Sequence, residues 1–542
     1  MTYLRLWLLG CVVLLTAGAA ARGADPPPAP DAADVQALAA QIDKYIAAAW
    51  ASAGVQPAPL ADDAEFLRRV YLDLAGRIPS VAEARAFLKD PSPDKRLRLA
   101  ERLVESPRYV THWTNVWRGI LLPEASANIQ ARLLMPSFEA WLREKLAANV
   151  GYNELVRELL TVPIDRSGIE VVYGPRREAG SALAYYLAKE ASPENLAAGV
   201  ARVFLGIRLE CAQCHDHPFA TWKREQFWGL AAFFAGIQRD RQGDFAFPRR
   251  EVADKRELTI PGTERVVQAT YPDGTQPVWR FKVSSRQTLA DWLTSRKNPY
   301  FAKATVNRLW FHFFGRGLID PVDEMVGGES EATHPELLDE LAREFAAHQF
   351  DLKFLIRAIV ASRTYQLTSA ATHPSQQDTR LFARMPLRGL TPEQLFDSLS
   401  QATGYQEAAP RNPGVVVLGG PMSPREEFLS RFTNQSDRPT EVQTSILQAL
   451  SLMNGRLIAD ATDLERSETL AAVLDAPFLD TRERIETLYL AALSRKPRPN
   501  ELERLLKFVE NSDGEDREKA RRQALADIFW VLLNSGEFFL NH

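Results

Sequence analysis

The sequence has 542 residues, of which 46% are hydrophobic and 25% are charged, which is the composition of an ordinary folded protein. The formal net charge is -4 and the positive charges are scattered, so we expect no nucleic-acid partner. A chain of this length predicts more than one domain.

Residues 1–24 resemble an export signal. Arg5 supplies a positive charge, and the apolar run that follows, residues 6–15, is too short to span a membrane comfortably. The stretch LLGC, which ends at Cys11, resembles a lipoprotein processing site, but the apolar run continues beyond it, so we do not expect lipidation there. Residues 25–34 are typical of a flexible linker. We therefore expect an exported protein of the periplasm or cell envelope, without a transmembrane segment after signal removal.

Helix signals dominate the rest of the chain. The stretches SVAE (Ser80–Glu83) and THPE (Thr333–Glu336) fit the capping box, in which a hydroxyl and a carboxylate satisfy free backbone amides at a helix start. Proline follows Thr391 at the start of another predicted helix, which we expect to end at Gly404. One apolar stripe at helical spacing consists of Leu352, Leu355, Ile356, Ile359 and Val360. These patterns predict a mainly α fold.

One region differs from this helical background. Residues 238–283 are polar, interrupted by proline and glycine, and rich in strand-forming residues. Within them, YPDG (Tyr271–Gly274) is a turn signal between two strand-like runs, so we expect a small β hairpin there. We therefore predict two helical domains, 35–237 and 284–542, joined by a short β-containing connector.

The most distinctive stretch is CAQCHDHP, which begins at Cys211. If Cys11 is removed with the signal, Cys211 and Cys214 are the only cysteines of the mature protein. CAQCH matches the C-x-x-C-H pattern of c-type haem attachment, in which two thiols bind the porphyrin and the adjacent histidine, here His215, ligates the iron. The pattern therefore predicts a haem c. Residues that could supply its second axial ligand are His112, His312, Met325 and His334.

The same stretch allows two other interpretations. Four soft or borderline donors lie within seven residues: Cys211, Cys214, His215 and His217. Zinc prefers thiolate and imidazole, and iron is the other metal we consider. Such close spacing makes it hard for all four donors to close a tetrahedron, so three of them with a distant residue or a water would form the site. A structural or redox-active thiol pair is the third interpretation. We expect the motif to lie on a loop between two packed helices.

Two further groups of residues can carry chemistry. Asp320 and Asp323 lie near Arg308 in the sequence, and paired carboxylates can do acid–base work or bind a hard cation. His112 lies among tryptophans and His312 on an aromatic helix. The simpler interpretation is a salt-bridged turn for the aspartates and core packing for the histidines.

Long stretches of the chain resemble a known pair of domains. Residues 203–237, which contain CAQCHDHP, resemble the hallmark of an exported domain of unknown function that is abundant in planctomycete-type bacteria. The stretch RRVYLDLAGRIPSVAEARAFL (Arg68–Leu88) resembles the N-terminal signature of that domain. Residues 289–325 and 334–369 resemble its usual companion domain. The resemblance covers nearly the whole mature chain.

The resemblance implies a site but no activity. The C-x-x-C-H-x-H-P element of the family falls on Cys211, Cys214, His215 and His217. Relatives often carry a cytochrome c-like domain, which implies association with redox proteins. One departure is that Arg118 follows Trp117, where many relatives have an acidic residue. From the motif and the resemblance together, we expect an exported protein with a Cys/His centre that binds a c-type haem and transfers electrons, with a redox or cell-envelope partner and an otherwise unassigned activity. The alternatives are a zinc or iron protein and a non-catalytic envelope scaffold or binding protein.

Overall fold

The computed structural model describes residues 31–123, 129–164, 181–216, 221–242, 245–325, 331–406, 423–432, 462–464, 466–511 and 517–542. Helices dominate these residues, and the strands among them form three two-stranded antiparallel sheets. The predicted mainly α fold is confirmed. Across the same ranges, no helix has both the length and the apolar character needed to cross a membrane. The predicted export signal lies outside the described residues.

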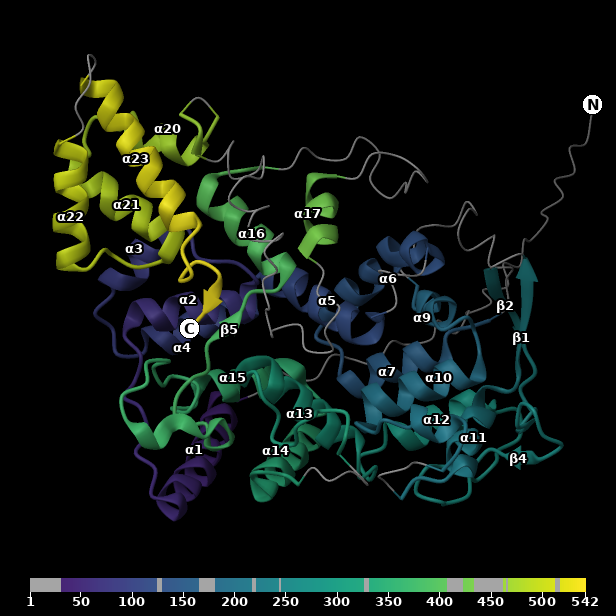
Figure 1. The fold of residues 1–542 in the computed structure, drawn as a ribbon. Coiled ribbons are helices and arrows are strands. Elements are labelled where there is room, and N and C mark those ends of the chain that lie inside the picture. The colour runs from purple at the N-terminus through teal and green to yellow at the C-terminus, as the bar shows by residue number, and fades with distance from the viewer. Residues whose placement is uncertain are drawn as a thin grey trace, which may run out of the picture.

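Figure 1 shows the helices in chain order, from purple to yellow. The N-terminal part contains α1 (Ala32–Ala53), α2 (Asp63–Ala75), α3 (Val81–Lys89), α4 (Lys95–Val104), α5 (Pro107–Leu121), α6 (Ile129–Ala147), α7 (Tyr152–Thr161), α9 (Leu183–Ala188), α10 (Pro193–Val200) and α11 (Arg224–Ala231). The C-terminal part contains α12 (Ser285–Leu293), α13 (Phe301–Phe314), α14 (Pro335–Ala347), α15 (Leu352–Ala361), α16 (Pro392–Thr403), α17 (Pro424–Phe432), α20 (Glu468–Leu474), α21 (Thr481–Leu493), α22 (Pro499–Glu510) and α23 (Arg517–Leu533).

The segment between these two parts carries short strands. β1 (Ile237–Gln242) pairs with β2 (Phe245–Glu251), and β3 (Glu257–Thr259) pairs with β4 (Val266–Gln268). Both strand pairs lie in the segment that was expected to contain a small β hairpin or connector. The expected turn at YPDG forms, because the Gly274 N–H donates to the Tyr271 carbonyl at 2.9 Å, but no strand of the described segment 245–325 follows this turn, so the hairpin does not form around it. After the turn, Trp279 packs on the Phe233 ring instead of joining a ladder, and proline, which cannot donate to a ladder, interrupts both flanks.

The predicted helix starts are confirmed at two of three positions. Ser80 and Glu83 form the expected capping box of α3, and Thr391 caps α16, which ends at Gly404. The capping box predicted at Thr333 is wrong. The Thr333 hydroxyl donates to the Leu318 carbonyl, and α14 begins one residue later, after His334. The Thr333 hydroxyl is therefore used for a hydrogen bond to a distant segment instead of capping the first turn of α14.

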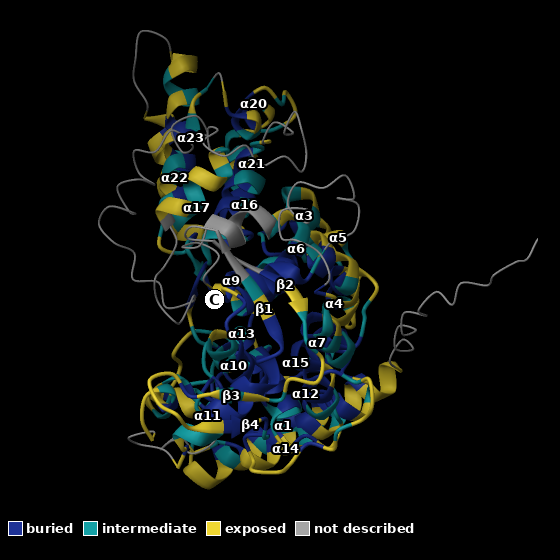
Figure 2. Ribbon diagram, turned by 90° about the vertical axis from the view of Figure 1, so that its right-hand side faces the viewer, coloured by how far each residue is buried: buried dark blue, intermediate teal, exposed yellow. Residues whose placement is uncertain are grey.

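Two hydrophobic cores hold the described residues together. The main core consists of residues between Val35 and Met385 together with Leu490, and it includes the five predicted apolar residues of α15. It therefore draws on both predicted domains and on the connector. The second core is built by α16 and α20–α23, with Leu72 and Ile78 from the N-terminal part. Figure 2 shows buried residues in the interior of the parts that hold the two cores. Figure 1 shows α20–α23 grouped at one end of the molecule and β1–β2 at the opposite end. The exact domain limits stay a prediction.

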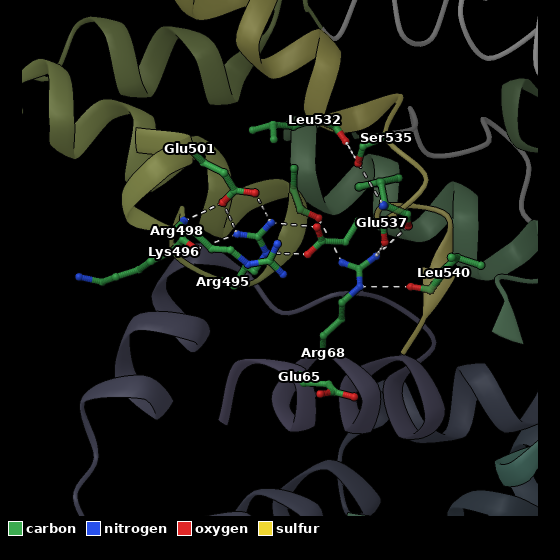
Figure 3. Close-up of polar contacts among 12 residues, drawn as sticks. Glu65, Arg68, Arg495, Lys496, Arg498, Glu501, Leu532, Ser535, Glu537 and Leu540 are labelled. Carbon is green, nitrogen blue, oxygen red and sulfur yellow. Dashed lines mark hydrogen bonds and ion pairs between the residues drawn. The ribbon is translucent and has the colours of Figure 1, made fainter. Parts of the chain in front are cut away.

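Helix α2 joins the two cores through buried charges. Arg68 donates to the backbone carbonyls of Ala492 and Phe538, at 3.2 and 2.7 Å. It also donates to the backbone carbonyls of Glu537 and Leu540, which are labelled in Figure 3. Burial lowers the pKa of Arg68 to about 10, while Glu537 acts in the opposite direction. Glu537 is itself paired with Arg495 at 2.6 Å. The end of the chain is thereby fastened to α2 rather than left as a tail.

Asp73, a second buried charge of α2, also binds the C-terminal part of the chain. Asp73, which is fully buried, accepts two hydrogen bonds from Arg388, at 2.8 and 2.9 Å, and one from Asn541 at 2.7 Å. The Tyr365 hydroxyl donates to the same carboxylate at 2.8 Å. Arg388 and Asn541 lie on β5 (Arg388–Gly389) and β6 (Leu540–Asn541), which pair with each other. One carboxylate therefore ties three distant segments together, which makes it a structural hub.

Candidate functional site: the thiol loop

The thiol loop, residues 206–216, carries Cys211, Cys214 and His215. Helix α10 continues as one π-helical turn that ends at Gly206 in the left-handed conformation, with φ 66°. The chain then forms a 3-10 turn over Glu210–Gln213, and α11 follows. The predicted placement of the motif between two packed helices is confirmed.

Both thiols of the loop are presented to solvent. Cys211 and Cys214 are exposed, and neither forms a disulfide. Side chains three residues apart in a 3-10 turn project on the same side. Cys214 directly follows the turn with right-handed helical backbone angles, so it keeps this relation to Cys211. The loop therefore offers two reduced thiols to one reagent or one prosthetic group.

The imidazole of His215 has one nitrogen already engaged. Its Nδ1 lies 2.7 Å from the backbone oxygen of Asp216. Because a carbonyl can only accept, Nδ1 carries the proton and Nε2 presents its lone pair. Metal-ligating histidines commonly have this arrangement, in which a carbonyl orients the ring and fixes its tautomer. His217, the fourth predicted donor, lies outside the described residues.

Helix α11 fixes the far end of the loop. The Asp216 carboxylate accepts hydrogen bonds from the Arg224 backbone N–H at 3.0 Å and from Lys223 Nζ at 2.9 Å, which lower the pKa of Asp216. The Trp228 indole donates to the Gln213 carbonyl at 3.0 Å. The aromatic residues after the motif that the structure describes are therefore used mainly for packing and for holding the loop.

Glu210 lies directly before the first thiol, and its Oε2 is buried with no hydrogen-bond partner. Burial raises the pKa of Glu210, and the Asp323 carboxylate adds to this, while Arg202 and Arg208 oppose it. Sequence reasoning did not single out Glu210. The signal that could have found it is a lone acidic residue between an apolar stretch and the first cysteine.

Within the described ranges, no three side chains of the His, Cys, Asp and Glu types converge closely enough to hold a metal ion. Cys211, Cys214 and His215 thus share one loop without meeting at one point. Haem attachment does not require such convergence, because the thiols bind the porphyrin edge while the histidine reaches the iron. Among the described residues, these three side chains therefore do not form a closed site for a small metal ion on their own.

The predicted aspartates both have arginine partners. Arg308 pairs with Asp323, and Arg316 lies 3.5 Å from Asp320. These contacts fit the salt-bridged turn that was the simpler interpretation. The turn nevertheless lies beside the loop, because Asp323 influences Glu210 and the Met325 N–H donates to the Gly206 carbonyl at 2.9 Å.

The predicted histidines His112 and His312 meet each other against α2. Their ring centroids are 5.8 Å apart. Burial lowers the pKa of each to about 3, while the nearby backbone of Asp73 acts in the opposite direction. The Nε2 atoms of both are buried without a hydrogen-bond partner. The pair is therefore neutral at physiological pH and packs in the main core.

Gly76, which ends α2, makes room for this pair. It has φ 69°, and a Cβ there would lie 2.6 Å from His112 Nδ1. We expect Gly76→Ala to lower the free energy of unfolding by about 2–4 kcal/mol, because it combines left-handed strain with overpacking. Gly54→Ala is the matched control, since Gly54 has φ 64° and open space around it, so only about 1 kcal/mol of strain is expected. Urea denaturation measures the free energy of unfolding of both variants. Equal losses would show that the His112 side chain can move aside without cost.

Two other predicted axial ligands lie in different surroundings. Met325 lies directly against the thiol loop, since a Cβ on Gly206 would lie 2.5 Å from its Sδ. His334 faces Thr333, with Nδ1 3.0 Å from the hydroxyl, and packs near the Phe382 ring. Of this pair, Met325 is the one with a contact to the loop that carries the thiols.

Two family models match the chain. Residues 41–239 match a model described as a protein of unknown function (DUF1549), and residues 285–426 match one described as a protein of unknown function (DUF1553). The chain therefore carries two domains of unknown function in tandem, as the resemblance implied. The thiol loop lies in the first matched region and the Asp320–Asp323 turn in the second. No curated protein and no solved structure matches the chain.

Proposed function

We propose that this tandem of two domains of unknown function is an exported electron-transfer protein that attaches a c-type haem through the thiol loop. One observation carries the proposal: two unpaired, exposed thiols on one side of a 3-10 turn stand next to an imidazole whose Nε2 is left available. A redox protein of the cell envelope is the partner that this chemistry requires.

The residues of the loop have distinct roles in this proposal. Cys211 and Cys214 would each add across one vinyl group, the sulfur bonding to one carbon and the thiol proton going to the other. His215 would give its Nε2 to the iron, with Nδ1 held by the Asp216 carbonyl. When bound, the haem would supply one-electron redox chemistry. The exposed position of both thiols supports the proposal, because an attachment apparatus must reach them.

The second candidate is a zinc or iron ion held by the same loop. It requires a further donor and a rearrangement of the loop, since the three described donors do not converge. His217 is the nearest predicted candidate in the sequence. Metal analysis of a colourless protein, with and without His217→Ala, tests this alternative. If metal is retained in the wild type and lost in His217→Ala, the ion replaces haem in the proposal.

Replacing both thiols tests the haem proposal directly. We expect Cys211→Ser with Cys214→Ser to abolish covalent haem while leaving the fold intact, because both side chains are exposed. The protein is produced in a strain that attaches haem to exported proteins, and intact mass and absorbance are measured after denaturation. The matched control is Ser535→Ala, a hydroxyl change at the C-terminal end, which should retain full haem. An unmodified wild-type mass under these conditions would refute haem attachment. The remaining interpretations would then be a structural or redox-active thiol pair and a non-catalytic envelope scaffold.

A further inference from the structure

The second domain of the tandem reaches across to the thiol loop through its backbone. The Met325 N–H donates to the Gly206 carbonyl at 2.9 Å, and Ile207 and Glu324 form an isolated antiparallel bridge. Gly206 and Ile207 are the first two residues of the loop. Its entry is therefore paired with a segment that belongs to the other matched region.

A side chain of the second domain reinforces this pairing. Arg308 on α13 donates through Nη2 to the Arg202 carbonyl at 3.1 Å, within the π-helical turn before the loop. The same nitrogen bonds the Asp323 carboxylate. Arg308 therefore links the helix that leads into the loop with the turn that pairs with it. A guanidinium suits this position because its several donors point in fixed directions.

The contact is also closely packed. A Cβ at Gly206 would lie 2.5 Å from Met325 Sδ and 3.4 Å from the Ala304 side chain, so glycine is needed for both its φ and its lack of a side chain. The second domain thus contacts the loop at its entry through both backbone and side-chain atoms.

We propose that Arg308, Asp323 and Met325 of the second domain position the thiol loop of the first, so that the site is complete only in the tandem. The inference deepens the proposed function, because it names what holds that site, but it concerns the loop itself and holds for a haem, a metal ion or a dithiol. It gives a physical reason for the two domains to occur in one chain: the chemistry-bearing residues come from one domain and their support from the other.

Hydrogen exchange of the loop tests the proposal without any cofactor. The reporters are the amides of Ile207 and Ala212, which bond the Ala201 and Leu209 carbonyls at 3.0 and 2.9 Å. In Arg308→Ala we expect these amides to exchange about fivefold faster, the factor that corresponds to roughly one lost hydrogen bond. A peptide from α15 in the main core should be unchanged, which separates loop loosening from global destabilisation. Arg308→Lys, with a single flexible ammonium group, should restore part of the protection.

Arg316→Ala is the matched control, because Arg316 pairs with Asp320 on the same turn. It should leave loop exchange as in the wild type. Equal loop exchange in folded Arg308→Ala and the wild type would overturn the proposal. If Arg308→Ala does not fold, the test is made in the wild-type protein, because the coupling between the loop and its support acts in both directions. Alkylation of Cys211 and Cys214 should then change the hydrogen-exchange rate of the Met325 amide. An unchanged rate at Met325 would overturn the proposal. If the protein carries no haem but its loop exchange responds as expected, the haem proposal is refuted and the positioning of the loop by the second domain still holds.

Discussion

Asp73→Ala should be among the most destabilising single substitutions in this protein, lowering the free energy of unfolding by about 3–5 kcal/mol. The substitution leaves the buried Arg388 guanidinium without its carboxylate and removes the acceptor for the Tyr365 hydroxyl and the Asn541 amide. An unpaired buried charge costs far more than the pair contributes, which is why the expected loss is large. Urea denaturation followed by tryptophan fluorescence measures it.

Asp63→Ala is the control for this experiment. Asp63 lies at the start of the same helix, where it pairs with Lys95 at 2.6 Å and Arg96 at 2.9 Å, but its side chain is partly exposed. Exposed ion pairs contribute little, so we expect a loss of about 1 kcal/mol or less. If Asp73→Ala and Asp63→Ala cost the same, the buried contacts of Asp73 are not the link between α2 and the C-terminal strand that the structure indicates.

Acidification should weaken the fold as the pH falls below 6.5. His112 and His312 have pKa values lowered from 6.5 to about 3 by burial, so unfolding at mildly acidic pH takes up protons. Their contribution to stability is complete above pH 6.5 and is lost as the pH falls from 6.5 towards 3. At pH 4.5 the loss is on the order of 2 kcal/mol for each ring. His334, whose pKa burial lowers to about 4, acts in the same direction, whereas the raised pKa of Glu210 opposes it.

The measurement is the free energy of unfolding at pH 7.5 and pH 4.5. His112→Asn isolates the contribution of one ring, because asparagine cannot be protonated in this range. We expect the variant to lose on the order of 2 kcal/mol less than the wild type between the two pH values. An identical loss in both proteins would mean that His112 is protonated in the folded state, contrary to its buried position.

Local signals in the sequence predicted the local structure well. Ser80 and Thr391 begin helices as expected, Gly404 ends one, and the stripe of α15 is buried. These features depend on side chains and backbone amides within a few residues of one another, which a single sequence displays. The failure at Thr333 has the opposite cause, because its hydroxyl bonds Leu318, fifteen residues away in the chain.

The candidate site was predicted by position rather than by geometry. The motif identified Cys211, Cys214 and His215, and the structure places them on the expected loop. The contact of Met325 with Gly206 could not be predicted, since the two residues are far apart in the sequence and no local pattern links them. His112 and His312 were assigned to the core as the simpler interpretation, but nothing in the sequence showed that they meet.

The buried charges of α2 are the largest feature that sequence reasoning missed. Arg68, Arg69 and Asp73 lie in a stretch that was used only for its family resemblance. Their spacing puts charges onto a helix whose other faces are apolar, which is a signal of buried pairing. Two of the partners, Arg388 and Asn541, lie more than 300 residues away, so only the folded chain identifies them.

Mass spectrometry and absorbance of the isolated protein show whether the thiol loop attaches a haem, as we propose. The mature wild-type protein is isolated from a strain that attaches haem to exported proteins, and its intact mass and reduced absorbance spectrum are recorded after denaturation. We expect one haem bound covalently through Cys211 and Cys214, seen as the added mass and as a haemochrome spectrum. A colourless protein of unmodified mass, with both thiols free to react with a maleimide, would contradict it.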